Sequence, residues 1–474
     1  MEKLFKLKAN NTTVKTEIMA GLTTFMTMAY IFALNPNILT GFKAEGQELW
    51  NGVFLATCIS SALGTIVMGL YANKPFAMAP GNGLNSFFAI VVGNLAALSG
   101  MTYLQSFRSA LCIVFIEGAV FIILSILNVR EKIVDAIPAA IRLGIGPSIG
   151  MMLLNIGLGS NAGVYNSDGE RFFVMRDFFG ALTANYASST MADAYPAMVL
   201  TVITMFFGLF VIITLSHKGL KGCVLYGILS ASVLYWIGEY FVLGINPFES
   251  LAGASFAPPF KDLADTTLFA LDFKGFMSLG WVTVTTLVVT FCVIDMFDTI
   301  GTLVGTANRA NMLDKDGKMP QMKEALMSDA IGTITGSLTG TSTVTTFVES
   351  ASGVEAGGRT GLTSVTTGIL FLLCMFIAPI AGIIPAPATS SALIYVGFLM
   401  MNGLKDIDFS DKTQLIPVAM MIIAMPISGS IGHGIGLALI TYSVMMIVMG
   451  RRKEVSLLTY LLSLLFLVKF FYAG

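Results

Sequence analysis

Long apolar runs recur along the chain, and they constrain its fold more than any other feature. Ala194–Leu215, Val224–Leu243 and Gly361–Ile380 are each long enough to cross a bilayer as a helix, which takes roughly 20 apolar residues. The 474 residues are 55% hydrophobic and only 12% charged, about half the share of charge in soluble domains. The sequence therefore predicts an all-α polytopic membrane protein.

Fourteen transmembrane spans are predicted, with centres near residues 28, 60, 87, 115, 147, 205, 233, 290, 332, 350, 371, 394, 419 and 440. With the N-terminus inside, 19 of the 27 Lys and Arg residues fall at inner positions and six at outer positions, as the positive-inside rule requires. Both termini are therefore expected on the cytoplasmic side of the cell membrane. The apolar tail Ser456–Tyr472 follows a basic cluster and is expected to be an interfacial helix.

A short internal repeat divides the chain into halves. Ala62–Leu70 (ALGTIVMGL) matches Ala330–Leu338 (AIGTITGSL) at an offset of 268, which places Lys74–Gly83 on Ser342–Ala351. Seven spans per half is an odd number, so the second half is expected to be inverted. Inverted repeats are typical of transporters whose substrate site lies near the membrane midplane between discontinuous helices. Chance similarity between apolar segments is the alternative.

The third and tenth spans are predicted to be broken. Two prolines in the third span each remove a backbone donor, so an extended piece over Phe76–Ala79 and a helix from about Pro80–Gly81 are expected. The β-branched, alternating segment Ser342–Phe347 is also predicted to be extended, with a helix from about Val348–Glu349. Extended backbone at membrane depth must be buried in protein or line a cavity, so the two pieces are expected to pair. Both half-helix N-termini would then point at one ligand site.

Three carboxylates lie in apolar sequence: Asp295, Asp298 and Glu349. Each costs about 2.5–3.5 kcal/mol if ionised at the membrane centre, and no Lys or Arg lies in these spans. At least one is therefore expected to be protonated part of the time or to bond a ligand, which makes all three candidates for proton coupling. The alternative is a helix cap or a bond to a neighbouring Ser or Thr, and this alternative is favoured for Asp295.

Asn85 and Glu117 are the other candidate polar residues. Asn85 lies one turn into the first half-helix and offers both a donor and an acceptor, so it is expected to bind the ligand unless it serves an interhelical hydrogen bond. Glu117 is expected to bond another helix instead.

Several classes of function are disfavoured. A net charge of −1 argues against a nucleic-acid partner. The five cysteines form no CxxC pair, and His217 and His433 are far apart, so neither a metal site nor a cofactor is expected. No HExxH or Walker A motif is present, which argues against an enzyme.

Four motifs carry a resemblance to a known family: AGLTTFMTMAYI, PFAMAPGNGLNSFFA, DMFDTIGTLVG and TTFVESASGVEAGGRTGL. Together they resemble the AzgA-like branch of the nucleobase transporters, the purine permeases of the nucleobase–cation symporter (xanthine–uracil permease) superfamily. The resemblance implies fourteen spans in two inverted seven-span repeats, with a core of spans 1–4 and 8–11 and a gate of spans 5–7 and 12–14. The expected segments are an N-terminus (1–16), core halves (17–128 and 276–382), gate halves (129–244 and 383–450), an extracytoplasmic loop (245–275) and a C-terminal helix (451–474).

The resemblance also implies an activity, namely import of adenine, guanine or hypoxanthine by proton symport, with an elevator-like movement of core against gate. The family's essential residues fall on Asn85, Asp298 and Glu349, and Phe76 takes the place of an aromatic residue that stacks on the base. Thr302 replaces a histidine of the uracil branch, and FVES, with Val348, replaces a glutamine-bearing motif of the xanthine branch. A homodimer through the gate is a family expectation.

Two alternatives remain open. One is an anion transporter or channel of the same architecture, which the acidic centre disfavours. The other is a uracil or xanthine permease.

Overall fold

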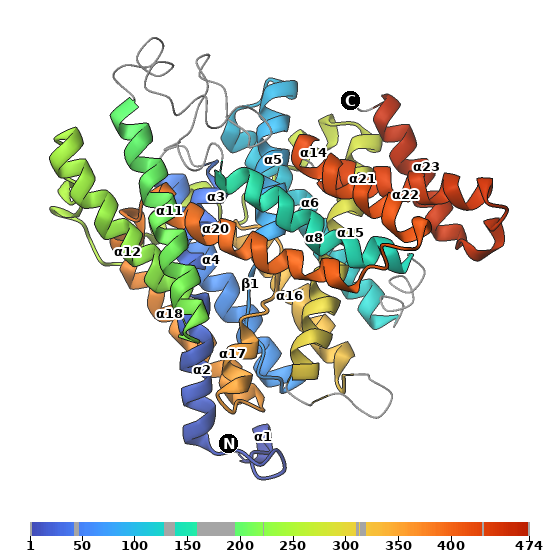
Figure 1. Ribbon diagram of the computed structural model, residues 1–474. Coiled ribbons are helices and arrows are strands. Elements are labelled where there is room, and N and C mark those ends of the chain that lie inside the picture. The colour runs from blue at the N-terminus through green and yellow to red at the C-terminus, as the bar shows by residue number, and fades with distance from the viewer. Residues whose placement is uncertain are drawn as a thin grey trace.

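The computed structural model describes residues 2–41, 47–127, 138–158, 195–220, 222–309, 312, 319–428 and 431–472. In this part the chain is helical almost throughout (Figure 1). The predicted inner and outer cations Lys43, Arg130, Lys132, Arg171, Arg176, Lys221, Lys315 and Lys318 lie outside the described residues, as do 129–137 and 159–194 of the expected first gate half.

The first half contains the following elements: α1 (Glu2–Phe5), α2 (Val14–Met28), α3 (Ile31–Leu39), α4 (Gln47–Val67), the π-helix η1 (Met68–Ala72), β1 (Met78–Pro80), α5 (Asn82–Ser99), α6 (Tyr103–Ile126), α8 (Ala139–Leu158), α11 (Tyr195–His217), α12 (Cys223–Gly238) and η3 (Glu239–Leu243). The outer connection contains η4 (Glu249–Leu251), α13 (Phe260–Thr266) and α14 (Phe273–Ser278). The second half contains α15 (Trp281–Arg309), α16 (Met322–Thr339), β2 (Val344–Thr346), α17 (Ser350–Glu355), α18 (Gly361–Leu373), η5 (Cys374–Ile377), α19 (Ala378–Gly382), α20 (Ala386–Met400), η6 (Met401–Asp406), α21 (Lys412–Ser428), α22 (Ile431–Val448), η7 (Arg452–Glu454) and α23 (Leu457–Tyr472).

Within the described ranges, seven helical segments are long and apolar enough to cross a membrane. These are Val14–Leu39, Glu48–Ala72, Tyr103–Ile126, Tyr195–His217, Cys223–Leu243, Trp281–Ile300 and Gly361–Gly382. Shorter apolar helices cover Asn82–Ala97, Ala139–Asn155, Lys412–Ser428, Gly432–Val448 and Leu457–Val468. The chain is therefore a mostly helical, multi-pass membrane protein, and the count of fourteen spans remains a prediction.

The helices pack in two groups. In one group, α16 packs on α4 and α6, and α18 packs on α2 and α4, so helices of the two halves of the sequence interleave. In the other group, α8 packs on α20 and α21, and α11 packs on α12 and α20. Figure 1 shows α12 and α22 at opposite sides of the molecule, with β1 near its centre. The assignment of these groups as a moving core and a gate remains a prediction.

The two predicted extended pieces pair with each other, which confirms that expectation. β1 and β2 form a two-stranded antiparallel sheet in which Met78 faces Thr346 and Pro80 faces Val344. Met78 and Thr346 are separated by the repeat offset of 268, so one pair of the sheet joins two equivalent residues of the repeat.

Threonine hydroxyls bond backbone groups of this two-stranded sheet, in the way that a neighbouring strand would in a larger sheet. The Met78 N–H donates to Thr65 Oγ1 at 2.9 Å, and the Thr65 hydroxyl donates to the Met78 carbonyl at 3.0 Å. The Thr333 hydroxyl donates to the Val344 carbonyl at 3.2 Å. Thr65 and Thr333 are themselves equivalent in the repeat, and their side chains satisfy backbone groups that have no water to bond.

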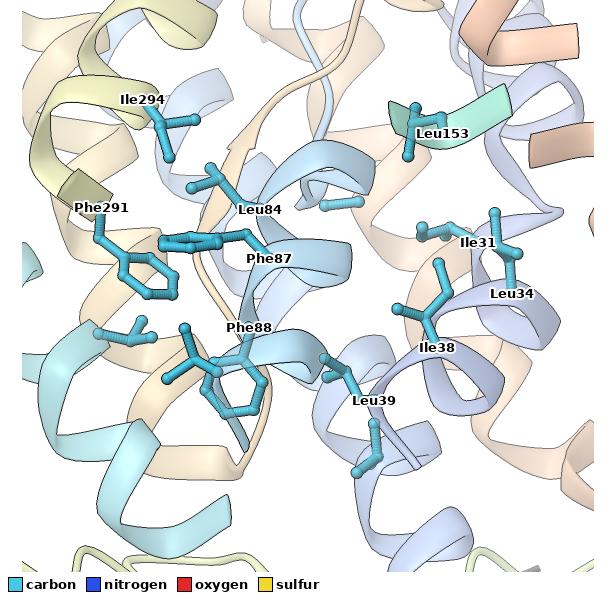
Figure 2. Close-up of a cluster of buried hydrophobic side chains, with 14 of the residues drawn as sticks. Ile31, Leu34, Ile38, Leu39, Leu84, Phe87, Phe88, Leu153, Phe291 and Ile294 are labelled. Atoms are coloured by element: carbon cyan, nitrogen blue, oxygen red, sulfur yellow. The ribbon is translucent and has the colours of Figure 1, made fainter. Parts of the chain in front are cut away.

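A hydrophobic cluster fixes the position of α5. Figure 2 shows Leu84, Phe87 and Phe88 of α5 lying between Phe291 and Ile294 of α15 on one side and the apolar face of α3 on the other. The ring centroids of Phe87 and Phe291 are 4.8 Å apart. Because such buried aromatic side chains dominate core packing, the first half-helix is held on both sides.

The apolar tail forms α23, which packs on α22 and contacts α15. Phe466 is fully buried against Gly436, and the Ser443 and Ser463 hydroxyls lie 2.8 Å apart. The opposite face leaves Leu457, Leu461 and Phe471 exposed. One side of this helix is therefore part of the protein's packing, and its expected place at the membrane interface remains a prediction.

Candidate functional site

The first half-helix begins where expected, with Gly81 at the N-cap of α5 in an extended conformation. Asn85 is fully buried one turn later, and its amide N–H donates to the Pro80 carbonyl at 3.0 Å. The Ser342 hydroxyl donates to Asn85 Oδ1. The Asn85 side chain therefore ties α5 to both extended pieces, and its role in binding ligand remains a prediction.

The second half-helix is much shorter than the first. α17 contains six residues with Glu349 at its N-cap, whereas α5 contains 18. The expected start near Val348–Glu349 is confirmed, but the length is not that of a span. Only α5 is therefore long enough to develop a substantial dipole, and the expectation that both half-helix N-termini point at one ligand site remains a prediction.

The Glu349 carboxyl is half-buried and is held by a residue of the first span. The Tyr30 hydroxyl donates to Glu349 Oε1 at 2.7 Å, and the Asn82 amide N–H donates to the Tyr30 oxygen at 3.0 Å. Tyr30 lies between α2 and α3, and Asn82 is the first residue of α5. The site thus joins three segments that are far apart in the sequence.

Asp298 lies on α15 and faces the beginning of α5. A Cβ placed on Gly81 would lie 3.6 Å from Asp298 Oδ2, which is ordinary van der Waals contact and places this carboxyl beside the N-cap of α5. Asp298 is half-buried and lies within electrostatic range of both Glu349 and Asp329. The structure therefore brings Asp298 and Glu349 to the same site, beside the crossing, which is the place where the segments β1–α5 and β2–α17 meet.

Asp295 belongs to a different, fully buried cluster beside β2. The Thr299 hydroxyl lies 3.0 Å from Asp295 Oδ1, 2.9 Å from Asp329 Oδ1 and 2.6 Å from the Thr345 hydroxyl. The favoured alternative for Asp295, a bond to a neighbouring threonine, is confirmed. Its candidacy for proton coupling remains a prediction.

Phe76, Thr302 and Val348, which were assigned to the site by resemblance, differ widely in solvent exposure. Phe76 is fully buried in a second hydrophobic cluster with Met68 and Leu303, so its ring presents no exposed face in this conformation. Thr302 is 7% exposed one turn after Asp298, and Val348 is 56% exposed. Stacking by Phe76, and the roles of Thr302 and Val348 in selectivity, remain predictions.

Glu117 bonds the protein, as expected. The Thr343 hydroxyl, just before β2, donates to Glu117 Oε2 at 2.7 Å. Glu117 is fully buried and therefore supports the extended piece of the second half rather than facing a ligand.

The inner end of the second half-helix is held by Glu17, which is also fully buried. Glu17 Oε1 accepts from the Arg359 backbone N–H at 2.9 Å, and Oε2 accepts from the Thr363 hydroxyl at 2.6 Å. The Arg359 guanidinium donates to the carbonyls of Val354 and Gly358. The connection from α17 to α18 is thus fixed by a carboxylate that sequence reasoning assigned no role.

Sequence reasoning also missed Tyr30 and Asn82. A tyrosine within an apolar span gives no polar signal of its own. The repeat offset was the available signal, because 268 residues separate Tyr30 from Asp298 and Gly81 from Glu349. Tyr30 beside Glu349 and Asp298 beside Gly81 are therefore equivalent pairs in the two halves.

Two broken helices that cross at a buried sheet beside a pair of half-buried carboxyls are the features of a membrane transport protein. Among the described residues, no three His, Cys, Asp or Glu side chains are grouped to hold a metal.

The particular family follows from comparison with known sequences. The sequence profile of the Permease family matches residues 15–432, and the chain belongs to this family. It is 42% identical over 472 residues to a putative permease of Methanocaldococcus jannaschii, covering 100% of this chain and 98% of that protein. It is 37% identical to the adenine permease AdeP of Escherichia coli (strain K12), covering 99% and 95% of the two chains. It is 33% identical to the guanine/hypoxanthine permease PbuO of Bacillus subtilis (strain 168), covering 99% and 100%. The resemblance to the nucleobase transporter superfamily is confirmed, and the chain is a transporter, not an enzyme.

Solved structures share the fold at low sequence identity. The transmembrane domain of the cyanobacterial bicarbonate transporter BicA superposes with a TM-score of 0.62 at 15% identity, covering 90% of this chain and 97% of that one. The murine anion transporter Slc26a9 in its inward-facing state gives 0.60 at 11% identity, covering 92% and 68%. These likenesses establish the architecture alone.

Proposed function

We propose that this chain imports purine nucleobases (adenine, guanine or hypoxanthine) across the cell membrane, and that a proton is the coupling ion. The identity to permeases named for adenine and for guanine and hypoxanthine, over nearly the whole length of both chains, supports the choice of substrate. A uracil or xanthine permease has no comparable support.

The observation that carries the proposal is the pair of carboxyls at the crossing. Asp298 and Glu349 form no ion pair with a described Lys or Arg, and both are only half-buried. Purine bases carry ring N–H groups, and adenine and guanine also carry an exocyclic amine, so carboxylate oxygens are suitable partners. A base bound here would lie at the N-terminus of α5, whose free N–H groups suit the acceptor nitrogens and oxygens of the ring.

The same pair provides a place for the coupling proton. Two carboxylates within electrostatic range repel each other while both are ionised, and each is costly in a membrane. A proton on one of them, together with a ligand that donates to the other, removes both penalties. Proton and base therefore favour each other's binding, which is the requirement for symport.

Movement of one helix group against the other supplies alternating access in this proposal. The crossing and its carboxyls belong to the group built on α4, α6, α16 and α18, while α8, α11, α20 and α21 form the other. We further propose that both termini are cytoplasmic and that the second group mediates any homodimer.

Uptake into proteoliposomes tests the proposal. Labelled hypoxanthine should accumulate when the outside is acidic, accumulation should collapse on addition of a proton uncoupler, and unlabelled adenine, guanine or hypoxanthine should compete. Movement of bicarbonate or sulfate without any purine uptake would contradict the proposal and favour an anion transporter. Competition by uracil or xanthine alone would contradict the substrate class.

A further inference from the structure

The Tyr30 hydroxyl lies between the carboxyl of Glu349, in the second half of the chain, and the side-chain amide of Asn82, in the first half. Tyr30 is 1% exposed, donates to Glu349 Oε1 at 2.7 Å and accepts from Asn82 at 3.0 Å. A phenol hydroxyl has one proton to give, and here it gives that proton to Glu349, which is the arrangement that an ionised carboxylate favours.

The Asn82 amide has an acceptor oxygen that no described residue bonds, which makes a second hydrogen-bond arrangement with Tyr30 possible. Asn82 is 9% exposed, and its Oδ1 atom is buried without a hydrogen-bond partner among the described residues. A buried acceptor without a donor bears an uncompensated desolvation cost, so its presence beside a hydroxyl calls for an explanation. The two ends of an amide have nearly the same shape, so rotation by about 180° exchanges donor and acceptor without repacking.

We propose that Tyr30 and Asn82 form a two-state hydrogen-bond relay that positions the Glu349 carboxyl in both of its protonation states. While Glu349 is ionised, the Asn82 N–H donates to the Tyr30 oxygen and the Tyr30 O–H donates to Glu349. When Glu349 takes up a proton, its new O–H donates to the Tyr30 oxygen, the Tyr30 O–H turns to Asn82 Oδ1, and the amide rotates. Two hydrogen bonds are present in each state, and no proton leaves Tyr30 or Asn82.

The relay deepens the proposed function and rests on it, because it names the residues that hold the coupling carboxyl. It also gives a protonation event at Glu349 a direct effect on the first residue of α5. The position of Tyr30 supports this role, since the equivalent residue of the second half is Asp298, itself a member of the site.

Other titratable groups also face Glu349. Asp298 approaches it from α15, and Tyr395 of α20 lies within its electrostatic range. Tyr395 is bonded to Ser216 at 2.5 Å, whereas Tyr30 bonds Glu349 itself. A change in pH response that depends on both Tyr30 and Asn82 therefore distinguishes the relay from these neighbours.

Transport kinetics provide the first test, using Tyr30→Phe, Asn82→Leu and the double variant in the full-length protein. A hydrogen bond to a charged group is roughly twice as strong as one between neutral groups, so loss of Tyr30 penalises the ionised state more. The alkaline limb of the pH profile of hypoxanthine uptake should move by about one pH unit to higher pH in Tyr30→Phe. Asn82→Leu should move it in the same direction by less, and the double variant should match Tyr30→Phe.

Tyr103→Phe is the matched control, because the Tyr103 hydroxyl donates to the Leu39 carbonyl at 2.6 Å, away from the Tyr30–Asn82–Glu349 contacts of the described residues. Its pH profile should coincide with that of the unmodified protein. An unshifted profile in Tyr30→Phe, or shifts from Tyr30→Phe and Asn82→Leu that simply add in the double variant, would overturn the relay.

Infrared difference spectroscopy gives a second readout that needs no substrate. The carbonyl band of protonated Glu349 is identified by its loss in Glu349→Gln, and its midpoint pH should shift in Tyr30→Phe but not in Tyr103→Phe. If the purified protein shows this shift and moves no purine, the relay holds and the proposed function fails. If it moves purine and the band does not shift, the relay fails and the proposed function holds.

Discussion

The two strand–helix segments that meet at the centre share a backbone plan and differ in almost everything else. Pro80 is followed by an 18-residue helix that begins with neutral amides, whereas β2 leads to a six-residue helix whose N-cap residue is the acid Glu349. At equivalent positions of the repeat, Gly81 corresponds to Glu349 and Asn85 to Gly353. A symmetric backbone therefore sets the location of the site, and asymmetric side chains give it its chemistry.

The difference extends to how each segment is held. α5 is fixed by its own length and by a hydrophobic cluster on both flanks. α17 is too short for that and depends on hydrogen bonds at its two ends, from Tyr30 at the beginning and through Glu17 at the connection to α18. The titratable half of the site is thus the half that is anchored by polar contacts.

Replacing the acid of the second half should have the largest effect. Glu349→Gln keeps the shape of the side chain and removes its charge and its exchangeable proton. Purine uptake should fall by about 30- to 150-fold, since a hydrogen bond to a charged group contributes roughly 2–3 kcal/mol. Initial rates of labelled hypoxanthine uptake measure this. Glu355→Gln, at the exposed end of α17, is the control and should retain normal uptake. Normal uptake by Glu349→Gln would contradict the proposal that the acid of the second half gives the site its chemistry.

Replacing Glu17, which holds the connection from α17 to α18, should destabilise the protein. In Glu17→Gln one carboxylate oxygen becomes an NH₂ group that faces backbone donors of residues 359–363, which leaves buried groups unsatisfied. The protein should lose about 2–3 kcal/mol of stability. A lowered apparent melting temperature in detergent measures it, with the exposed Glu48→Gln as control. Equal melting temperatures for the two variants would show that α17 needs no polar anchor.

Glycines on the two half-helices should respond in opposite ways to alanine. In α17, a Cβ on Gly353 would meet Thr24 and lie 2.8 Å from the Ala20 carbonyl oxygen, so Gly353→Ala should cost roughly 1–3 kcal/mol through overpacking. In α5, a Cβ on Gly93 would meet nothing within 4 Å, so Gly93→Ala should stabilise by about 0.5–1 kcal/mol. Thermal unfolding of both variants compares them directly. A stabilised Gly353→Ala protein would contradict the close packing of α17 on α2.

The smallest expected difference concerns the two threonines beside the sheet. Thr65→Val removes two hydrogen bonds to Met78 and should cost about 1–3 kcal/mol, whereas Thr333→Val removes one bond to Val344 and should cost about 1 kcal/mol. Valine has nearly the shape of threonine, so packing is conserved. Unfolding measurements compare the loss of stability in the two variants. A larger loss in Thr333→Val than in Thr65→Val would contradict the expected order.

Much of the crossing could be predicted from the residues. The prolines around β1 and the β-branched alternation of β2 exclude continuous helices, and the need to satisfy backbone groups at membrane depth leaves pairing as the solution. The starts of α5 and α17 followed from the same reasoning. These features depend on local backbone chemistry, which a single sequence expresses directly.

The long-range contacts that complete the site could not be predicted from the sequence around each residue. Tyr30 and Glu17 reach partners more than 300 residues away, and nothing in their own segments indicates those partners. The shortness of α17 was likewise hidden, because the glycines that end it also suit close packing within a longer helix. Phe76 illustrates the limit of assignment by resemblance, since its ring lies inside a hydrophobic cluster.

The separation of the two strands also bears on how the chain is made. β2 emerges from the ribosome 266 residues after β1, which at typical synthesis rates is roughly 13–50 seconds later. During this interval the first strand lacks its partner strand and has the Thr65 and Asn85 side chains of its own half to bond its backbone, so the nascent protein contains an unfinished polar segment within the membrane. Closure of the site is therefore expected to be a late event in biogenesis, one that cannot precede synthesis of α15, α16 and β2.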